Sequence, residues 1–574
     1  MEKWIVRKYD DRLMKSLTKG LGIDPVAARL LIAKGIESVE EAEKFLDPSI
    51  LHLHDPFLFS EMKEAVSLFV NSVREGKKIL IHGDYDADGI CGTALLYEGL
   101  KNFGADLHFF VPDRAKDGYG LSMRVMKRGV DKNLGLLIST DCGSSDREVV
   151  AYLSEHGVKT IITDHHDIDE RIPEADIFIN PKLPGEKYPF TELAGVGVAF
   201  KFLQALEKQT GKDLGLEGML DLVAVGTLGD YVMLEDENRV LVSLGMKTLA
   251  RWERNGFCAL QAVSNLPRSG FTARQICFNI VPRLNSPGRI GSARDTVLLL
   301  TTDDREKAFS IAGDIEEINT MRRSLDSAVT EEASYLADIN IRKEQPNALV
   351  FSSESWHEGV VGIAASRLTE KYSLPAVLIA VKGDTGKGSV RSAGRINVRK
   401  TLDSCSEYLV AFGGHREAGG FSIRKENIYN FRNKFNKVTA EQYDTDKKED
   451  NLFVDIECEV EHCDMELVYF LKRMEPFGPG NDEPVFLIKN IWVKQGSRIV
   501  GNGHLKICGI DGKDRKQDFI GFSLGRAWNP ADIMGKWIDL LVNVRMNEWQ
   551  GKQELQFQVK TIRYSEKENG VLCD

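Results

Sequence analysis

The pattern of apolar and polar positions changes several times along the chain, and these changes divide it into parts. From about residue 61 to 245, short apolar runs alternate with amphipathic stretches such as 61–73 and 199–208. Strands alternating with helices are typical of an α/β domain built on a parallel sheet. We therefore expect such a domain at 61–302. Residues 1–60 look helical, carry no catalytic residues in a recognisable pattern, and are interpreted as an accessory segment.

A long uninterrupted helix is predicted between residues 303 and 340. Residues 304–338 contain no proline and only one glycine. Apolar side chains recur there at helical spacing, at Ile311, Ile315, Ile318, Met321 and Leu325. We expect this helix to join the first domain to the part of the chain that follows.

Two further units are predicted beyond that helix. The apolar runs 348–351 and 376–380 indicate a second, smaller α/β unit at 341–440, and the polar stretch 441–451 is typical of a linker. Residues 452–565 contain short alternating runs broken by turns such as 501–503. That pattern predicts a small β-barrel.

Composition narrows the class of protein without identifying a function. At 574 residues, with 42% hydrophobic and 28% charged residues, the chain is expected to be globular and to contain several domains. It has no apolar run long enough to span a membrane and no signal peptide, so we expect no membrane association and a cytoplasmic location. Its net charge of −11 means that an anionic substrate must be met by a local cluster of Arg and Lys, or by metal.

The candidate chemistry lies where the predicted strands end. The run 79–81 leads into the segment HGDYDADG, 136–138 leads to Asp141, and 160–163 leads to Asp164-His165-His166. Because the carboxyl ends of parallel strands meet at one edge of a sheet, these side chains are expected to converge. The run 177–179 precedes Asn180-Pro181, and the run 222–225, before Asp230, fits a strand or a helix equally well. Carboxylates and imidazoles at this density suit Mn²⁺ or Mg²⁺.

Four motifs give the chain a specific resemblance. HGDYDADGICGTALL at 82–96, TDCG at 140–143, TDHHD at 163–167 and LVAVGTLGD at 222–230 have the order and spacing found in the DHH phosphoesterase family. Segments such as PRLNSPGRIG, WHEGVVGIAASRL and GGHREAGGF resemble the bacterial branch that degrades single-stranded DNA from its 5′ end. One departure is Gly229-Asp230-Tyr231, where the family more often has Ala-Asp-Val.

The resemblance implies a fold and a mechanism. The implied fold is α/β, with a parallel-sheet DHH domain, a long helix, a smaller α/β DHH-associated domain and a C-terminal OB-like β-barrel. The implied mechanism uses two divalent cations, Mn²⁺ or Mg²⁺. The first is held by Asp86 and Asp141, with His82 as a further candidate, and the second by Asp88, Asp141, His165 and Asp230. A shared Asp141 helps to offset the repulsion between two cations.

The remaining site residues are expected to act around these ligands. If the strand continues through His165 and His166, the two rings face opposite ways, so His166 is predicted to contact a phosphate. The predicted catalytic set is therefore Asp86, Asp88, Asp141, His165, His166 and Asp230. Asp84 and Asp164 are predicted to accept hydrogen bonds that orient the ligands.

A substrate phosphate also needs cationic or polar support on its other oxygens. The candidates, which the resemblance supports, are Arg114, Arg283, Asn285, Arg289, Ser389, Arg391 and His415. In the barrel, Phe477 and Trp549 are predicted to stack on bases and Lys506 to meet the DNA backbone.

These observations predict a single-stranded-DNA-specific 5′-to-3′ exonuclease with a two-metal mechanism. The resemblance implies work in DNA repair and recombination, as a monomer, with single-strand-binding protein and a RecQ-type helicase as partners. One alternative is a phosphodiesterase for cyclic dinucleotides or short RNA oligomers, whose relatives typically lack the barrel. Another is a non-catalytic DNA-binding scaffold, which the intact set of acids and histidines disfavours.

Overall fold

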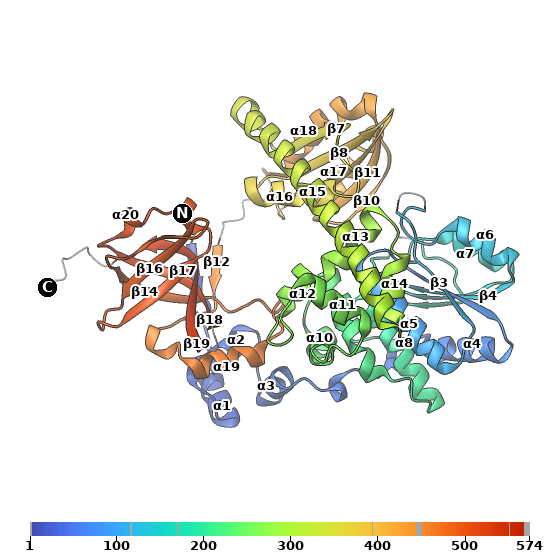
Figure 1. The fold of residues 1–574 in the computed structure, drawn as a ribbon, viewed down its shortest axis with the longest axis horizontal. Coiled ribbons are helices and arrows are strands. Elements are labelled where there is room, and N and C mark those ends of the chain that lie inside the picture. The colour runs from blue at the N-terminus through green and yellow to red at the C-terminus, as the bar shows by residue number, and fades with distance from the viewer. Residues whose placement is uncertain are drawn as a thin grey trace.

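The computed structural model has three lobes and describes residues 3–114, 117–168, 171–392, 394–443, 451–549 and 552–566, without the side chains of 548, 549 and 552 (Figure 1). The first lobe holds the metal-ligand motifs, the second lies above it in Figure 1, and the third is a barrel at the left. Within these ranges, no helix is both long enough and apolar enough to cross a membrane.

The first lobe is built on a five-stranded parallel sheet with the order β3-β2-β4-β5-β6. Its strands are β2 (Lys78–Gly83), β3 (Leu107–Phe110), β4 (Leu134–Thr140), β5 (Lys159–Thr163) and β6 (Ile177–Ile179). The near-continuous apolar runs follow from burial on both faces. One face packs against α4 (Met62–Arg74), α5 (Ala87–Phe103) and α8 (Gly195–Thr210), and the other against α6 (Met123–Asp131) and α7 (Arg147–Glu155).

A group of helices completes this lobe. They are α9 (Leu220–Asp230), α10 (Asp236–Leu249), α11 (Asn255–Ser264), α12 (Ala273–Asn279), α13 (Val281–Ile290) and α14 (Arg294–Thr301). The run 222–225, which fitted a strand or a helix, lies inside α9, and all four of its residues are buried. A helix that is apolar on every side is a core helix, which explains why it shows no helical stripe in the sequence.

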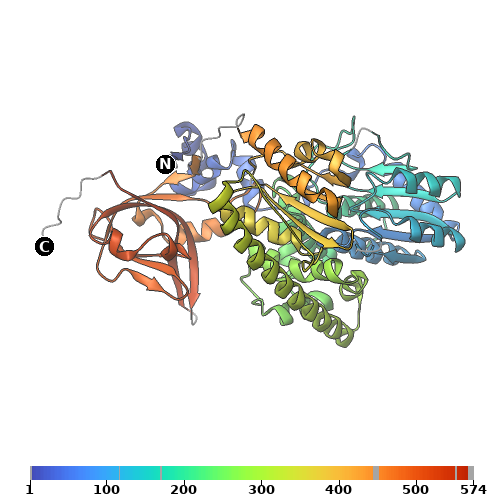
Figure 2. The same ribbon diagram turned by 90° about the horizontal axis from the view of Figure 1, so that it is seen from above.

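The predicted connecting helix is confirmed as α15 (Arg305–Glu344), which is 40 residues long. Asp304 caps its start by accepting a hydrogen bond from the Lys307 N–H at 3.1 Å. The helix packs against α11 and α13 of the first lobe and then against α16 of the second, as Figure 2 lets the reader follow. It therefore fixes the two α/β lobes on one rigid element.

The second lobe is a mixed sheet with the order β10-β11-β9-β8-β7. Its elements are β7 (Leu349–Ser353), α16 (Val361–Tyr372), β8 (Ala376–Lys382), β9 (Thr385–Arg391), α17 (Val398–Asp403), β10 (Leu409–Gly414), β11 (Ala418–Arg424) and α18 (Ile428–Tyr443). Both predicted apolar runs are strands. The predicted linker 441–451 begins inside α18, and residues 444–450 lie outside the described residues.

The third lobe contains the predicted barrel. Its strands are β13 (Ile456–Glu457), β14 (Phe486–Val493), β15 (Arg498–Val500), β16 (His504–Ile510), β17 (Lys516–Gly521), β18 (Trp537–Trp549) and β19 (Lys552–Tyr564), with helices α19 (Met465–Met474) and α20 (Pro530–Ile533). The pairings run β14-β18-β19-β17-β16, and β14 also pairs with β16, so five strands form a closed ring.

The N-terminal segment is packed into this third lobe. It comprises β1 (Lys3–Val6), α1 (Asp11–Leu21), α2 (Pro25–Ala33) and α3 (Val39–Leu46). Strand β1 pairs in parallel with β12 (Asn451–Val454), and Leu17, Leu30 and Leu31 share one core with Leu471 of α19 and with the barrel. Reading residues 1–60 as helical missed β1, because its partner strand lies near the other end of the chain.

A buried arginine ties the first lobe to the third. Arg239 of α10 donates to the Phe45 carbonyl at 2.8 and 3.1 Å, to the Met474 carbonyl at 3.0 Å and to the Glu475 carbonyl at 3.2 Å. These carbonyls lie at the ends of α3 and α19, where backbone acceptors have no partner within the helix. Burial lowers the pKa of Arg239 to about 10, so the guanidinium still carries its charge at neutral pH.

Candidate metal centre

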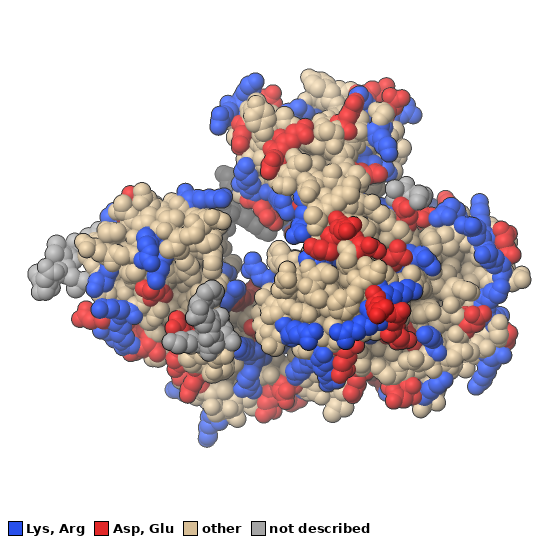
Figure 3. Space-filling model, in the orientation of Figure 1, with Lys and Arg blue, Asp and Glu red and all other residues tan. Residues whose placement is uncertain are grey.

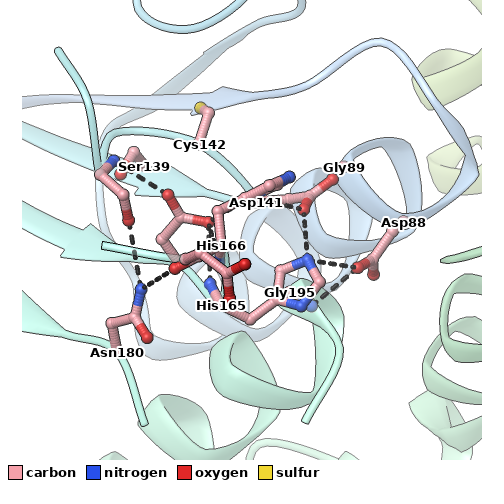
Figure 4. A network of polar contacts seen from close by, with 12 residues as sticks. Asp88, Gly89, Ser139, Asp141, Cys142, His165, His166, Asn180 and Gly195 are labelled. Carbon is pink, nitrogen blue, oxygen red and sulfur yellow. Dashed lines mark hydrogen bonds and ion pairs between the residues drawn. The ribbon is translucent and has the colours of Figure 1, made fainter. Parts of the chain in front are cut away.

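The predicted ligands converge at the carboxyl edge of the parallel sheet. Asp84 and Asp86 follow β2, Asp141 follows β4, and His165 follows β5. Asp230 is the last residue of α9, a helix and not the strand that would have placed it at the same edge. Figure 4 shows Asp88, Asp141 and His165 approaching one another from different elements.

Helix starts hold two of the acids in place. Asp86 caps α5, since its Oδ1 accepts from the backbone N–H groups of Asp88 at 3.1 Å and Gly89 at 3.2 Å. Asp88 accepts from the N–H of Gly195 at 2.7 Å, at the start of α8. A Cβ on Gly195 would lie 2.7 Å from the Asp141 Cβ, so glycine allows α8 to approach the cluster this closely.

Three sets of side chains at this sheet edge could each hold a cation. The sets are Asp88, His165 and Asp230; Asp84, Asp86 and Asp141; and Asp141, His165 and His166, with the ligand atoms of each set within 4.8 Å of one another. His165 Nε2 lies 3.2 Å from Asp141 Oδ1 and 3.5 Å from Asp230 Oδ2. Asp141 belongs to two sets, which is the geometry expected of an acid that bridges two cations.

The electrostatics of the cluster fit a cation site. Burial, reinforced by neighbouring carboxylates, raises the pKa of Asp141 and Asp230 far above the ordinary range and that of Asp88 to about 7. Burial also lowers the pKa of His165 to about 3, which keeps its ring neutral. A divalent cation would replace the protons on these acids.

Unpartnered atoms support the same conclusion. His165 Nε2 and Asp84 Oδ1 are buried and make no hydrogen bond. A buried polar atom without a partner costs free energy. His165 and Asp84 therefore fit a site for a metal ion, which would accept a lone pair from each of these two atoms. Oxygen and imidazole donors without thiolate favour Mn²⁺ or Mg²⁺ over zinc.

His166 occupies a different electrostatic position from His165. Its Nδ1 donates to Asp164 Oδ1 at 2.8 Å, and its Nε2 lies 2.9 Å from the Tyr119 hydroxyl. Although burial lowers the pKa of His166, the bond to Asp164 and the nearby carboxylates raise it to about 9. A pKa of about 9 favours the protonated ring at neutral pH, and the bond to Asp164 orients that ring.

The two histidines do not lie on opposite faces of a strand. Strand β5 ends at Thr163, before either histidine, so the alternation of a strand does not apply. The two rings lie 4.7 Å apart, and His166 Nδ1 is 3.8 Å from Asp141 Oδ1. His165 is the more buried of the two and alone joins Asp88 and Asp230, and the two rings also differ in charge and hydrogen bonding.

His82 lies apart from the ligand sets, and Asp84 lies in one of them. His82 is still inside β2, on the same face as Leu80, and its Nε2 accepts from the Ser122 N–H at 3.2 Å. It joins none of the ligand sets formed by the described residues, whereas Asp84, just beyond the strand, joins the set with Asp86 and Asp141. Sequence spacing alone does not show where a strand stops.

Guanidinium groups gather beside the cluster. Arg114 and Arg289 line a cavity of about 370 Å³ with Gly359 of the second lobe. Burial, together with the charges of Arg114, Arg322 and Arg391, lowers the pKa of Arg289 to about 10. Arg322, on α15, was not anticipated, because the helical pattern there carries no motif. Like charges held this close create a site for an anion.

Ser389 and Arg391 reach the site from β9. A Cβ on Gly362, in α16, would lie 3.1 Å from Arg391 Nη2 and 3.3 Å from Ser389 Oγ. Both side chains therefore pack beside this glycine. His415 is exposed between β10 and β11 and, after Lys182, helps to lower the pKa of Asp167 in the first lobe. The second lobe thus faces the metal-ligand edge.

One of the residues predicted to contact a substrate phosphate contacts other parts of the protein instead. Arg283 lies with its Nε 2.6 Å from Glu316 Oε2 and donates to the Asn279 carbonyl at 2.6 Å, so it joins α13 to α15. Asn285 is half-buried on α13.

In the barrel, Phe477 packs against the core, and Lys506 pairs with Asp518 at 2.7 Å. The Trp549 side chain lies outside the described residues.

Comparisons with known proteins agree with this arrangement. Family models match as the DHH family N-terminal domain at 78–227, the DHHA1 domain at 345–441 and the RecJ OB domain at 454–561. The single-stranded-DNA-specific exonuclease RecJ of Bacillus subtilis is 33% identical, over 98% of this chain and 71% of its own. Crystal structures of Thermus thermophilus RecJ with Mn²⁺ and with Mg²⁺ superpose with TM-scores of 0.84 and 0.77, at 28% and 27% identity, over 98% of this chain and 80% and 79% of theirs.

Proposed function

This chain belongs to the RecJ family of single-stranded-DNA-specific exonucleases, and from that premise we propose that its ligand cluster is the active site of a metal-dependent exonuclease that removes nucleotides from the 5′ end of single-stranded DNA. The observation that carries the proposal is the meeting of Asp88, Asp141, His165 and Asp230 within ligand distance at one sheet edge. All the acids and histidines of the four motifs are present, which disfavours the scaffold alternative.

Two cations, when bound, would activate water and stabilise the leaving oxygen. Asp88, His165 and Asp230 would hold one, and Asp84 and Asp86 the other, with Asp141 shared. The neutral ring of His165 supplies a lone pair, because burial keeps its pKa low. The backbone bonds to Asp86 and Asp88 fix these carboxylates before substrate arrives.

The cationic residues would hold the substrate phosphates. The pKa of about 9 favours a protonated His166, whose Nε2–H would donate to a phosphate oxygen in place of the Tyr119 hydroxyl. Arg114, Arg289 and Arg391 lie where the first and second lobes meet, close enough that the charges of Arg114 and Arg391 help burial to lower the pKa of Arg289.

The presence of the barrel favours a polymeric substrate over a dinucleotide. A RecJ OB domain beside the two α/β lobes suits capture of a strand longer than the site itself, which argues against dinucleotides or very short RNA as the main substrate. We further propose work as a monomer in DNA repair and recombination in the cytoplasm, with single-strand-binding protein and a RecQ-type helicase as partners.

Digestion of end-labelled strands tests this function. Single-stranded and duplex DNA, and single-stranded RNA, labelled at the 5′ or the 3′ end, are incubated with the full chain and Mn²⁺ or Mg²⁺. We expect the 5′ label to be released first as mononucleotide from single-stranded DNA. Early release of the 3′ label, or equal rates on duplex DNA, would refute the assigned polarity or strand choice.

A further inference from the structure

We propose that Cys458 and Cys463 form a reversible thiol-oxidation site in the third lobe, in which a hydroperoxide oxidises Cys458 and Cys463 then closes a disulfide with it. Neither residue belongs to the metal centre or to the motifs of the proposed exonuclease, so the site goes beyond the proposed function. Four residues separate the two cysteines, and no CxxC motif marks them in the sequence. The structure holds both as free thiols.

The two sulfurs are in contact. Cys458 directly follows β13, and Cys463 directly follows the 3₁₀ turn Val460–His462, which leads into α19. This turn brings the two side chains together, and the Cys463 thiol donates to Cys458 Sγ at 3.8 Å. A disulfide needs the sulfurs about 2.05 Å apart. Rotation of the two side chains and a small shift of the turn supply the remaining approach.

The hydrogen bond gives the two thiols different roles. Cys463 is the donor and Cys458 Sγ the acceptor, while the Cys458 thiol itself donates to the Glu459 carbonyl at 3.4 Å. The bond to Cys458, together with burial, raises the pKa of Cys463 far above its usual range, so Cys463 keeps its proton. Only a thiolate attacks a peroxide readily. We therefore assign the attack to Cys458 and disulfide closure to Cys463.

A small oxidant can reach Cys458 but not Cys463. Cys458 lines a cavity of about 740 Å³ between α2 and the barrel, and its neighbours Glu459 and His462 line the same cavity. Cys463 is not among the lining residues and is only 3% exposed. The oxidant therefore meets Cys458 first, and Cys463 lies behind it within reach of its sulfur.

Arg29 supplies a positive charge to this cavity. Lys489 and Lys513 line the cavity too, but each pairs with a neighbouring glutamate. Arg29 makes no ion pair within the described ranges, and its Nε is buried without a hydrogen-bond partner. Its guanidinium lies 4.4 Å from the centre of the Tyr9 ring, which holds it in place. A cation at the cavity wall attracts the anionic form of a thiol that lines the same cavity.

The oxidation balances with hydrogen peroxide as the only co-reactant. The Cys458 thiolate attacks one peroxide oxygen, an S–O bond forms, the O–O bond breaks, and the departing hydroxide takes up the proton that Cys458 released. Cys463 then attacks the sulfenic sulfur, the S–S bond forms, the S–O bond breaks, and the second hydroxide leaves as water with the Cys463 proton. Two electrons pass from the two thiols to the peroxide.

Disulfide closure protects Cys458 from irreversible damage. A sulfenic acid that no thiol captures is oxidised further to sulfinic and sulfonic acids, which a dithiol does not reduce. The disulfide, in contrast, returns to two thiols by exchange with a dithiol. Because the bond joins the end of β13 to the start of α19, both sulfurs stay within one folded lobe throughout.

Mass spectrometry after peroxide treatment tests the site. The full chain is treated with hydrogen peroxide, the remaining thiols are alkylated, and the tryptic peptide 449–472, which contains both cysteines, is weighed before and after reduction with dithiothreitol. We expect this peptide to become lighter by two hydrogen masses, to resist alkylation, and to regain both thiols on reduction. In Cys463→Ser, dimedone should label Cys458, and prolonged treatment should add oxygen that dithiothreitol does not remove.

Cys508→Ser is the matched control, because Cys508 is a half-buried cysteine of the same lobe, on β16, with no hydrogen bond to another cysteine among the described residues. This variant should form the disulfide as wild type does. Cys458→Ser should give neither a disulfide nor a dimedone adduct in peptide 449–472. Two alkylated thiols in that peptide after excess peroxide, or dimedone on Cys463 in Cys458→Ser, overturns the proposal.

Discussion

Asp141 carries more of the proposed chemistry than any other residue. It belongs to two ligand sets, and its φ of 60° places a non-glycine residue in the left-handed region beside the cluster. Residue types and spacing were enough to predict Asp86, Asp88, Asp141, His165 and Asp230 as neighbours. They could not predict that His82 stays inside β2 or that Arg322 reaches the site, because both depend on where elements end and pack.

The two histidines should differ in what they hold. His165→Ala removes a neutral donor from two ligand sets, so bound Mn²⁺, measured by elemental analysis after desalting, should drop by about one ion per chain. His166→Ala removes a cation held by Asp164, so turnover should fall about 100-fold with most metal retained. Equal metal loss in both variants contradicts this division.

At the scale of elements, hydrophobic periodicity predicted the helices and strands that depend on the local sequence alone. Helix α15 was predictable because 304–338 has no proline and keeps one apolar spacing, whereas α9 was ambiguous because it is apolar all round. Strand β1 was missed because its four residues are ordered by β12, a partner that no local pattern reveals.

The junction of α13 with α15 gives a prediction at this scale. Glu316→Ala leaves the buried Arg283 guanidinium without its carboxylate and should lower the free energy of unfolding by about 2 kcal/mol, less than for a fully buried pair because Glu316 is partly exposed. Urea denaturation followed by circular dichroism measures the loss. The neighbouring exposed Glu317→Ala is the control, and an equal effect in both variants argues against the pairing.

At the scale of the whole molecule, the three lobes act as one frame around the active site. Figure 3 shows an opening where the lobes meet, with Lys and Arg side chains at its edge. Arg239 holds the third lobe to the first through backbone carbonyls at the ends of two helices, and α15 holds the second lobe to the first. Arg239, together with the Leu234 N–H that donates to the Pro479 carbonyl at 2.7 Å, thus helps to set the position of the barrel relative to the active site.

Removing the Arg239 guanidinium should loosen the barrel. Arg239→Met keeps the apolar stem but removes the donor to the carbonyls of Phe45 and Glu475, whereas the Met474 carbonyl keeps its bond from the Asn481 amide. We expect a loss of about 3 kcal/mol in the unfolding free energy. Limited proteolysis near residues 475–485 should accelerate. A melting temperature and digestion pattern identical to wild type would show that the lobes are held by other contacts.

The effect of removing the barrel should depend on whether the N-terminal helices are removed with it. Ending the chain at residue 443 strips the apolar cover from α1, α2 and α3, so the product should aggregate, whereas residues 49–443 should stay folded. This shorter piece should still cleave very short oligonucleotides with Mn²⁺ but lose affinity for long strands. If residues 1–443 and 49–443 behave alike in size-exclusion chromatography, the shared core is not what orders the N-terminal helices.

The central claim is that the carboxylate and histidine cluster hydrolyses single-stranded DNA with divalent metal. The most direct measurement is release of mononucleotide from a 5′-labelled single strand by wild type and by Asp141→Ala, each with saturating Mn²⁺ and with metal removed by chelation. We expect turnover only from wild type with metal, at least 10³-fold above Asp141→Ala, while the variant still binds the strand. Substantial turnover by Asp141→Ala, or by wild type without metal, would contradict the account.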